Sequence, residues 1–539
     1  MDKFLGWWRV DKRYMVLLKA VLLALLPFLC CVVYCAAQGR IIGQVYLPGS
    51  EWNDELFYYK QVEGIVSFGY PQGYFGFNES HALKLSFAAW SPVLVFPWIL
   101  WGLLFGWNLM SPIWCNLFLM TLCCFLFVWL VRPTWKQLGI LAFLFCLYTP
   151  FVRYILSGMP EVICFAMLIL FYGISINYLE REKNWKLVML VIMSGIMTLM
   201  RPYLLLFLLL PLFFWMKKNR RKGAVGSLFV LAAVLGTYAG IKHYLGAEYF
   251  APLFFTDWVT AFFEQGFFGG IRYTLAKLYY MGTDFLGHTL QGFRTGLASG
   301  AFFGGYLVMM AVLIIQILRD FIGIRRRRRE GAATPEDEDR KQRNMLIVEG
   351  HLAFCFVAML FALLLMYKLT EGSKHLLTFM AAGLFIVALM ETGFYKKAVL
   401  VGAVFAYLYT YKAVDPYDYQ VPFVAQERQA QLEDWTGAFE ELLTLSGKAP
   451  NFDNVVMWVF NDEIDGQREN LEWQLLYGLP KGFGISCCMP DYVIQNFGSL
   501  KCRYMATLSG GRIDGMCADA GYRELYRSGS LVLYMIWAN

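Results

Sequence analysis

The chain has 539 residues, of which 58% are hydrophobic, 18% aromatic and only 16% charged, and its formal net charge is +7. A soluble domain usually carries about 25% charged residues, so the composition excludes an ordinary soluble protein. The basic residues stand in short clusters that flank long apolar runs, which is typical of the loops of a membrane protein. The positive charge therefore does not indicate a nucleic-acid partner.

Apolar runs follow one another from the N-terminus to residue 411. A spanning helix needs roughly 20 mostly apolar residues. The runs that reach or approach this length are 14–36, 86–106, 111–131, 138–156, 160–178, 187–200, 202–216, 223–241, 300–318, 345–367, 376–391 and 397–411. The first run lacks a small-residue cleavage site, which favours a signal anchor over a removed signal peptide.

The loop charges orient these runs. The clusters expected in the cytoplasm are the N-terminal tail with Lys3, Arg9, Lys12 and Arg13, then 132–136, 181–186, 217–222, 325–329 and 396–397. If every run crossed, the cluster at 132–136 and all later clusters would lie outside. The conflict disappears if 86–106 does not cross, and this run is broken by Pro92 and Pro97. We predict about eleven crossings, a cytoplasmic N-terminus and an extracytoplasmic C-terminal domain.

The predicted architecture is a polytopic α-helical membrane domain, residues 1–411, followed by a small extracytoplasmic α/β domain, residues 412–539. The external segments of the first domain are the loops 37–110 and 242–299 and the turns 153–161 and 368–375. The aromatic residues of 242–299 are expected at the membrane interface. The stretch 319–344 has five consecutive arginines followed by acids, which predicts a cytoplasmic linker. Binding of anionic lipid headgroups is the alternative. The lack of organelle signals favours a bacterial inner membrane.

The C-terminal domain alternates predicted strands and helices, which favours an α/β sandwich. Helices are expected at 426–446 and 516–527, and strands at 454–460, 501–508 and 531–537. An extracytoplasmic location favours disulfides. One or two are expected among Cys487, Cys488, Cys502 and Cys517. No CxxC pair is present, which argues against a zinc site.

An acidic cluster in the first external loop is the first candidate site. Three acids, Glu51, Asp54 and Glu55, occur within five residues and precede Tyr58 and Tyr59. Acids beside aromatics at a membrane surface suit a general base or a metal ligand. The simpler interpretation is a solvated helix start, where acids favour the helix dipole.

Three basic features lie on the same predicted face. Arg153 and Glu161 flank a helix junction, and Arg201 stands at a break between two apolar helices. Lys374 and His375 precede the apolar run 376–391. These cations suit a phosphate-bearing lipid. The simpler interpretations are a helix-start acid, a snorkelling arginine and a solvated turn.

The order of these features resembles the GT-C superfamily of membrane glycosyltransferases, especially the protein O-mannosyltransferase and aminoarabinose transferase branch. In that branch an Asp-Glu pair before an aromatic begins the first external loop, as Asp54-Glu55 with Tyr58 does here. A second acid follows an arginine at a helix start, as Glu161 follows Arg153, although aspartate is common at that position. A later external turn carries basic residues before an apolar helix, as Lys374 and His375 do.

The resemblance implies an inverting enzyme whose donor is a sugar on a polyprenyl phosphate, with no nucleotide. Asp54 would be the general base, and Glu55 or Glu161 would orient the acceptor or hold a divalent cation such as Mg²⁺ or Mn²⁺. Arg153, Arg201 or Lys374 would neutralise the leaving phosphate, and Tyr58 and His375 would contact substrate. The acceptor would be a glycan, a lipid or a protein.

Other functions fit the same sequence features. A lipid-linked polysaccharide polymerase or ligase would use the same donor class, with pyrophosphate as the leaving group. A transporter or flippase of lipid-linked sugars predicts internal repeats and charges near the membrane midplane. The sequence shows no repeat, and its candidate acids lie on one face. A non-enzymatic assembly protein would not depend on Asp54.

Overall fold

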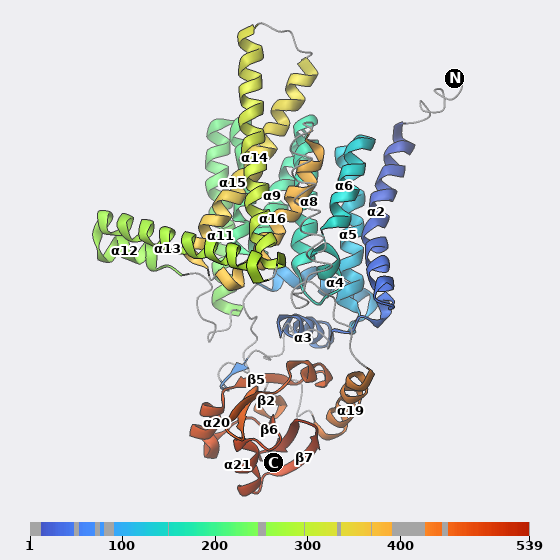
Figure 1. Cartoon of the computed structure of the whole chain (residues 1–539), viewed down its shortest axis with the longest axis vertical. Coiled ribbons are helices and arrows are strands. Elements are labelled where there is room, and N and C mark those ends of the chain that lie inside the picture. The colour runs from blue at the N-terminus through green and yellow to red at the C-terminus, as the bar shows by residue number, and fades with distance from the viewer. Residues whose placement is uncertain are drawn as a thin grey trace.

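The chain folds into a multi-pass helical membrane bundle with a sheet-containing domain at one end (Figure 1). The computed structural model describes residues 12–47, 53–69, 76–79, 91–148, 150–245, 255–295, 297–330, 336–367, 369–390, 426–444 and 451–537. Within these residues, six helices are long and apolar enough to cross a membrane. The predicted span 397–411 lies outside the described residues.

The helices of the bundle follow the predicted runs closely. They are α2 (Lys12–Ala37), α5 (Ser111–Val131), α6 (Trp135–Leu147), α8 (Glu161–Glu180), α9 (Asn184–Met200), α10 (Leu205–Lys218), α11 (Arg220–Leu245), α14 (Leu297–Glu330), α15 (Glu336–Met366) and α16 (Leu369–Leu389). Helix α8 is buried along almost its whole length against α5, α9, α15 and α16. The apolar side chains of α2 and α11 are largely exposed, as expected for helices that face lipid.

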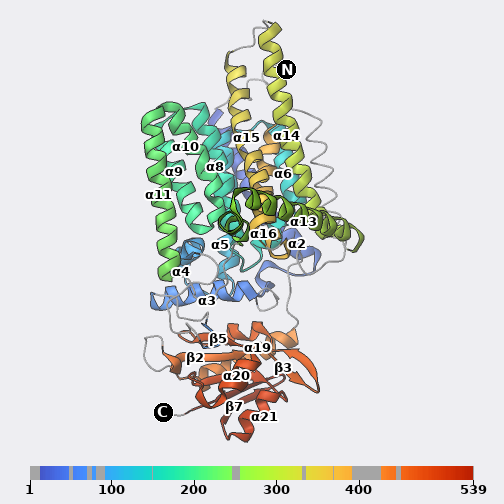
Figure 2. The same cartoon turned by 90° about the vertical axis from the view of Figure 1, so that its left-hand side faces the viewer.

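The segment predicted not to cross is short in the structure. A 3₁₀ turn, η3 (Pro92–Val95), leads into α4 (Phe96–Phe105), which has only 10 residues. At 1.5 Å per residue such a helix reaches about half of the hydrocarbon thickness. The helix packs against α3 and α5 at the end of the bundle that faces the sheet domain (Figure 2).

Three predicted loops are helical. The loop 242–299 contains α12 (Asp257–Glu264) and α13 (Gly266–Thr295), which run across the direction of the bundle helices (Figure 1). Within the predicted linker 319–344, residues 319–330 continue α14 and residues 336–344 begin α15, because Arg and Glu are good helix formers. The turn predicted at 368–375 is the first part of α16.

The aromatic residues of α12 and α13 are strongly exposed, among them Phe263, Phe267, Phe268, Tyr279 and Tyr280. Exposed aromatics on a helix that lies across the bundle axis are typical of the membrane interface. The predicted interfacial position of this segment therefore agrees with its direction and exposure.

A six-stranded sheet organises the C-terminal domain, in the order β1-β5-β2-β6-β8-β7. The strands are β1 (Gly76–Phe77), β2 (Val455–Val459), β5 (Gly484–Cys488), β6 (Tyr504–Leu508), β7 (Arg523–Ser528) and β8 (Leu531–Met535). The first four in spatial order are parallel, and β8 pairs antiparallel with both β6 and β7. A separate hairpin joins β3 (Asn461–Ile464) to β4 (Gln467–Asn470).

Alternating side chains of the central strands pack on the two faces of this sheet. Val456, Trp458 and Tyr504 face α19 (Gln426–Leu442) and the 3₁₀ helix η6 (Trp473–Gly478). Val455 and Met505 face the other side, where α20 (Pro490–Asn496) and α21 (Arg512–Asp519) pack. The predicted α/β sandwich is thus present.

Two predictions for this domain are wrong. The helix expected at 516–527 ends at Asp519, and β7 begins at Arg523 after Gly521 reverses the chain with φ +71°. A backbone with positive φ suits glycine and ends the helix. The four cysteines Cys487, Cys488, Cys502 and Cys517 are all free thiols buried in the domain. They contribute to packing, and no disulfide joins them.

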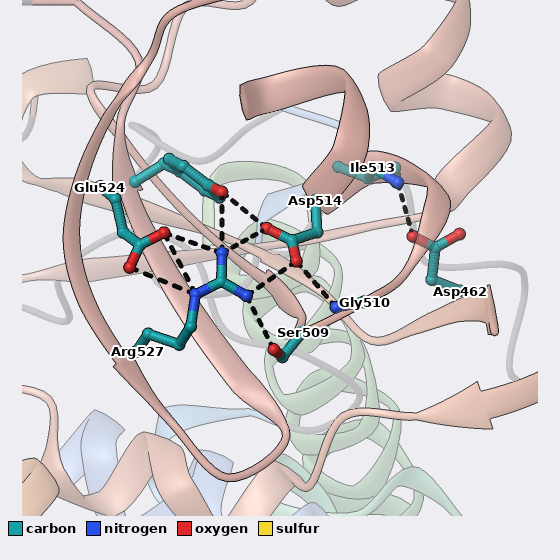
Figure 3. Close-up of polar contacts among 8 residues, drawn as sticks. Asp462, Ser509, Gly510, Ile513, Asp514, Glu524 and Arg527 are labelled. Carbon is teal, nitrogen blue, oxygen red and sulfur yellow. Dashed lines mark hydrogen bonds and ion pairs between the residues drawn. The ribbon is translucent and has the colours of Figure 1, made fainter. Parts of the chain in front are cut away.

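A charge cluster fixes α21 to the antiparallel edge of the sheet (Figure 3). Arg527 donates through two nitrogens to the two carboxylate oxygens of Asp514, each at 2.9 Å, and Tyr534 donates to Asp514 at 2.6 Å. Burial raises the pKa of Asp514, but the hydrogen bonds from Arg527 and Tyr534 outweigh burial, so its pKa lies below the ordinary 3.8.

This lowered pKa makes the stability of the domain depend on pH. The ionised Asp514 stabilises the fold fully above pH 3.8, and this contribution is lost as the pH falls through its lower folded pKa. We expect Asp514→Asn to lower the melting temperature at pH 7, and the difference from the wild type to shrink in the acid range. Thermal melting of the full-length protein at both pH values is the measurement. A difference that does not change with pH would contradict the prediction.

The sheet domain is tied to the first external loop at two places. Strand β1 from that loop forms the edge of the sheet beside β5. Helix α3 (Asn53–Phe68) lies between the bundle and the sheet domain in both views (Figures 1 and 2). Lys60 Nζ on α3 donates to the Leu479 carbonyl at 2.6 Å. The sheet of the predicted C-terminal domain therefore includes a strand from the first external loop.

Candidate functional site

Helix α3 presents the predicted acidic cluster to the end of the bundle. Asp54 is half-buried in the first turn, whereas Glu55 is fully buried. Glu55 Oε1 accepts a hydrogen bond from the Gly158 amide at 3.3 Å and lies 3.9 Å from Arg153 Nη1. A Cβ at position 158 would stand 3.2 Å from the Glu55 Cβ, so glycine allows this close approach.

Arg153 belongs to the short helix α7 (Pro150–Ile155), which precedes the loop to α8. Asn116 of α5 holds this loop, because its amide nitrogen donates to the carbonyls of Tyr154 at 3.3 Å and Ser157 at 3.0 Å. The Asn116 amide oxygen accepts from Trp98 Nε1 of α4 at 2.9 Å. The non-crossing segment thus helps to position Arg153 and Gly158.

A second buried ion pair, Glu161 with Arg201, joins the start of α8 to the junction between α9 and α10. Glu161 is the first residue of α8, after Pro160. Arg201 lies between α9 and the 3₁₀ turn η4 (Pro202–Leu204), because the following proline ends the α-helix. Arg201 Nη2 lies 2.5 Å from Glu161 Oε1, and both side chains are 0% exposed.

The Arg201 guanidinium also contacts two aromatic partners. Its Nη1 donates to the Tyr203 hydroxyl at 3.0 Å and lies 3.2 Å from His375 Nδ1. Because arginine can only donate, Nδ1 is the acceptor, and the neutral ring carries its proton on Nε2. That nitrogen lies 3.2 Å from the Tyr367 hydroxyl. His375 is therefore a positioned neighbour of the arginine and not an isolated cation.

Tyr58 connects the acidic helix to this ion pair. It lies one helical turn after Asp54 on α3. Burial raises the pKa of the Tyr58 phenol, the Asp54 carboxylate raises it further, and the Arg201 guanidinium opposes them. Tyr58 is thus within electrostatic reach of both groups and stays protonated as a hydrogen-bond donor.

The structure brings together seven of the predicted site residues: Asp54, Glu55, Tyr58, Arg153, Glu161, Arg201 and His375. The eighth, Lys374, lies in α16, and its side chain is outside the described residues. The charged residues of α12 and α13 form surface pairs away from this site, Asp257 with Lys277 and His288 with Asp284.

Three residues that contribute to this site were not predicted from the sequence. Tyr203 and Tyr367 contact His375, and Asn116 holds the loop after Arg153. Tyr203 stands two residues after Arg201, and this spacing is a usable signal. An asparagine in the middle of an apolar span is another signal, because polar groups in spans are costly and need partners.

A divalent cation fits this donor set poorly. Among the residues that the structure describes, no group of three or more His, Cys, Asp or Glu side chains is placed to hold a metal ion. Glu161 Oε1 lies 2.5 Å from Arg201 Nη2, so an arginine already pairs with this carboxylate.

Comparison with solved structures finds two similar chains. The crystal structure of ArnT from Cupriavidus metallidurans in the apo state has 11% sequence identity and a TM-score of 0.42, over 96% of this chain and 97% of that chain. The same protein bound to undecaprenyl phosphate gives 11% identity and a TM-score of 0.41, over 96% and 98%.

No protein-family model matches the chain, and no curated protein matches it.

Proposed function

We propose that the chain is a membrane glycosyltransferase that moves a sugar from a polyprenyl phosphate to an acceptor hydroxyl, with inversion. The observation that carries the proposal is the pair of buried Arg–Glu contacts near the half-buried Asp54: Glu55, the next residue, lies beside Arg153, and Tyr58 interacts with Asp54, Arg201 and Glu161. The same end carries the sheet domain (Figure 1).

Buried charges support a catalytic interpretation of this end. Transferring an ionised group from water to the protein interior costs several kcal/mol, and the attraction of a partner often only balances that cost. Ionisable residues within membrane proteins are therefore retained mostly for function. Here two such pairs lie near Asp54, which is only half-buried. The arginines suit a charged lipid phosphate, and Asp54 is accessible to an acceptor hydroxyl.

The proposed reaction is a displacement at the anomeric carbon. Asp54 accepts the proton of the acceptor hydroxyl, the acceptor oxygen bonds to the anomeric carbon, and the bond from that carbon to the phosphate oxygen breaks. The polyprenyl phosphate leaves with the bonding electron pair. Arg201 and Arg153, with Lys374, stabilise the negative charge that develops on the phosphate. The proposed mechanism contains no metal-dependent step.

The ion pairs suggest separate roles for the two glutamates. Glu161 holds Arg201 at 2.5 Å, which favours a positioning role over direct contact with the acceptor. Glu55 lies 3.9 Å from Arg153, and its proposed role is contact with a substrate hydroxyl. Tyr58 and His375 remain proposed substrate neighbours.

We place the site on the extracytoplasmic side of a bacterial inner membrane. The beginning of α2 and the arginine-rich tip of α14 lie at the end of the bundle opposite the sheet domain (Figure 1). Positive charge favours the cytoplasmic side, so the sheet domain and the site lie outside. The exposed aromatics of α12 and α13 are proposed to flank the entrance of the lipid donor.

The test is release of the polyprenyl carrier from a panel of polyprenyl-phosphate and polyprenyl-pyrophosphate sugars, with native membranes as the acceptor source. We expect turnover by the wild type and a loss of about 10²–10⁴-fold for Asp54→Asn, the usual contribution of a general base. Asp284→Asn is the matched control, because Asp284 is 52% exposed on α13. A parallel assay with EDTA measures metal dependence.

Equal turnover by Asp54→Asn and the wild type would exclude Asp54 as the base. Turnover of a pyrophosphate-linked donor alone would indicate the polymerase or ligase function instead. No turnover of any donor would overturn the transferase proposal.

A further inference from the structure

Tyr477 of the sheet domain reaches the acidic helix α3. It belongs to η6, and its ring centroid lies 5.5 Å from that of Tyr59 on α3. Tyr59 in turn stacks on Trp107 at 5.5 Å, and its carbonyl accepts from Trp107 Nε1 at 3.1 Å. The phenol of Tyr477 is therefore held in a packed aromatic layer next to the candidate site.

Contacts on both sides of η6 fix this position. Trp473 packs edge-on against Phe57 of α3 at 5.8 Å. On the other side, a Cβ at Gly478 would stand 2.8 Å from Thr436 Oγ1 of α19, so the turn fits only with glycine there. The turn is thus clamped between α19 and α3, and the Tyr477 side chain has little freedom to move.

The hydroxyl of Tyr477 is buried without a hydrogen-bond partner among the residues that the structure describes. Buried hydroxyls nearly always have a partner, because losing hydrogen bonds to water is costly. An apolar phenylalanine would fill the same space without that cost. A ligand that binds beside η6 can supply a hydrogen bond to this hydroxyl.

The surroundings of this hydroxyl show what kind of partner fits. Burial raises the pKa of the Tyr477 phenol well above its ordinary value, and the Glu55 carboxylate raises it further. The phenol thus stays protonated. Glu55 lies one helical turn before Tyr59, the residue that Tyr477 contacts, on the same face of α3. An alcohol group can donate to a carboxylate and accept from a phenol at the same time.

We propose that Tyr477 is a substrate-binding residue supplied by the sheet domain, and that one hydroxyl of the donor sugar binds between its phenol and the Glu55 carboxylate. This inference rests on the proposed function and adds the contact that recognises the sugar. It also assigns a role to the sheet domain, which closes the site from outside through η6.

The test compares Tyr477→Phe with Tyr526→Phe in the donor-release assay. The control also loses a phenol, but one that bonds to Asp434 at the far edge of the sheet. We expect Tyr477→Phe to lose about 3- to 10-fold in kcat/KM for the donor, the value of one hydrogen bond, mostly through KM. Its melting temperature should equal or exceed that of the wild type, because a hydroxyl without a partner is removed.

The double variant Tyr477→Phe with Glu55→Gln tests whether the two residues bind the same sugar hydroxyl. If both residues bind one sugar hydroxyl, the loss in the double variant is smaller than the product of the two single losses. Unchanged kinetics in Tyr477→Phe, or a loss matched by a lower melting temperature, would overturn the role of Tyr477 alone. Absence of wild-type turnover would overturn the proposed function together with this inference.

Discussion

An Arg201→Met variant is expected to lose both its activity and about 3–5 kcal/mol of stability, the usual effect of removing one partner of a buried ion pair. The substitution leaves the Glu161 carboxylate uncompensated at 0% exposure. It also removes the donor that holds Tyr203 and His375. Thermal melting in detergent and the donor-release assay measure the two effects.

The double variant Arg201→Met with Glu161→Gln separates stability from chemistry. Neutralising both partners removes the uncompensated charge, so we expect most of the lost stability to return. Activity should not return, since the cation proposed to neutralise the leaving phosphate is still missing. A double variant with wild-type turnover would remove Arg201 from the mechanism, and a single variant with wild-type stability would contradict the buried ion pair.

Glu79→Ala is expected to detach the first external loop from the sheet domain and to cost about 3–5 kcal/mol. Glu79 Oε1 accepts from the amides of Lys501 and Cys502, both at 2.7 Å, and Oε2 accepts from the Tyr492 hydroxyl at 3.1 Å. Hydrogen bonds to a charged group contribute about 1.5–3 kcal/mol each, and alanine leaves buried donors without partners.

The measurement for Glu79 is amide hydrogen exchange of the segment that contains Cys502 and β6, together with the melting temperature. We expect faster exchange there in Glu79→Ala. Glu79→Gln is the matched control, because its amide oxygen can still accept from both backbone amides. Unchanged exchange in Glu79→Ala would show that the pairing of β1 with β5 is sufficient to hold the loop.

The first external loop contributes to both the sheet and the candidate site. Residues 76–79 complete the sheet, while α3 of the same loop carries Asp54 and Glu55. A weakened Glu79 contact should therefore reduce turnover as well, through the position of η6 and Tyr477 above the site. The loss should be smaller than in Asp54→Asn, since no reacting group is removed.

The helical membrane bundle and the sheet at its C-terminal end could be predicted from the sequence, whereas the roles of the site residues stay predictions. A membrane-spanning helix satisfies all its backbone hydrogen bonds within one segment, so it can be predicted from the apolar sequence of that segment alone. Loop charge and the two prolines of 86–106 predict a segment that does not cross, and the described part of this segment contains only the 10-residue helix α4. Asp54, Arg153 and Arg201 stood out because charge is rare and costly in such a chain.

Only the tertiary structure decided which charges pair. Arg153 and Glu161 are eight residues apart and were expected to act together, yet Arg153 lies beside Glu55 and Glu161 binds Arg201. The tertiary structure likewise decided that β1 joins β5 and that Tyr477 lies over α3. These contacts join segments from 40 to more than 400 positions apart. Hydrophobic periodicity reports which face of an element is buried, but it carries no information about which distant segment covers that face.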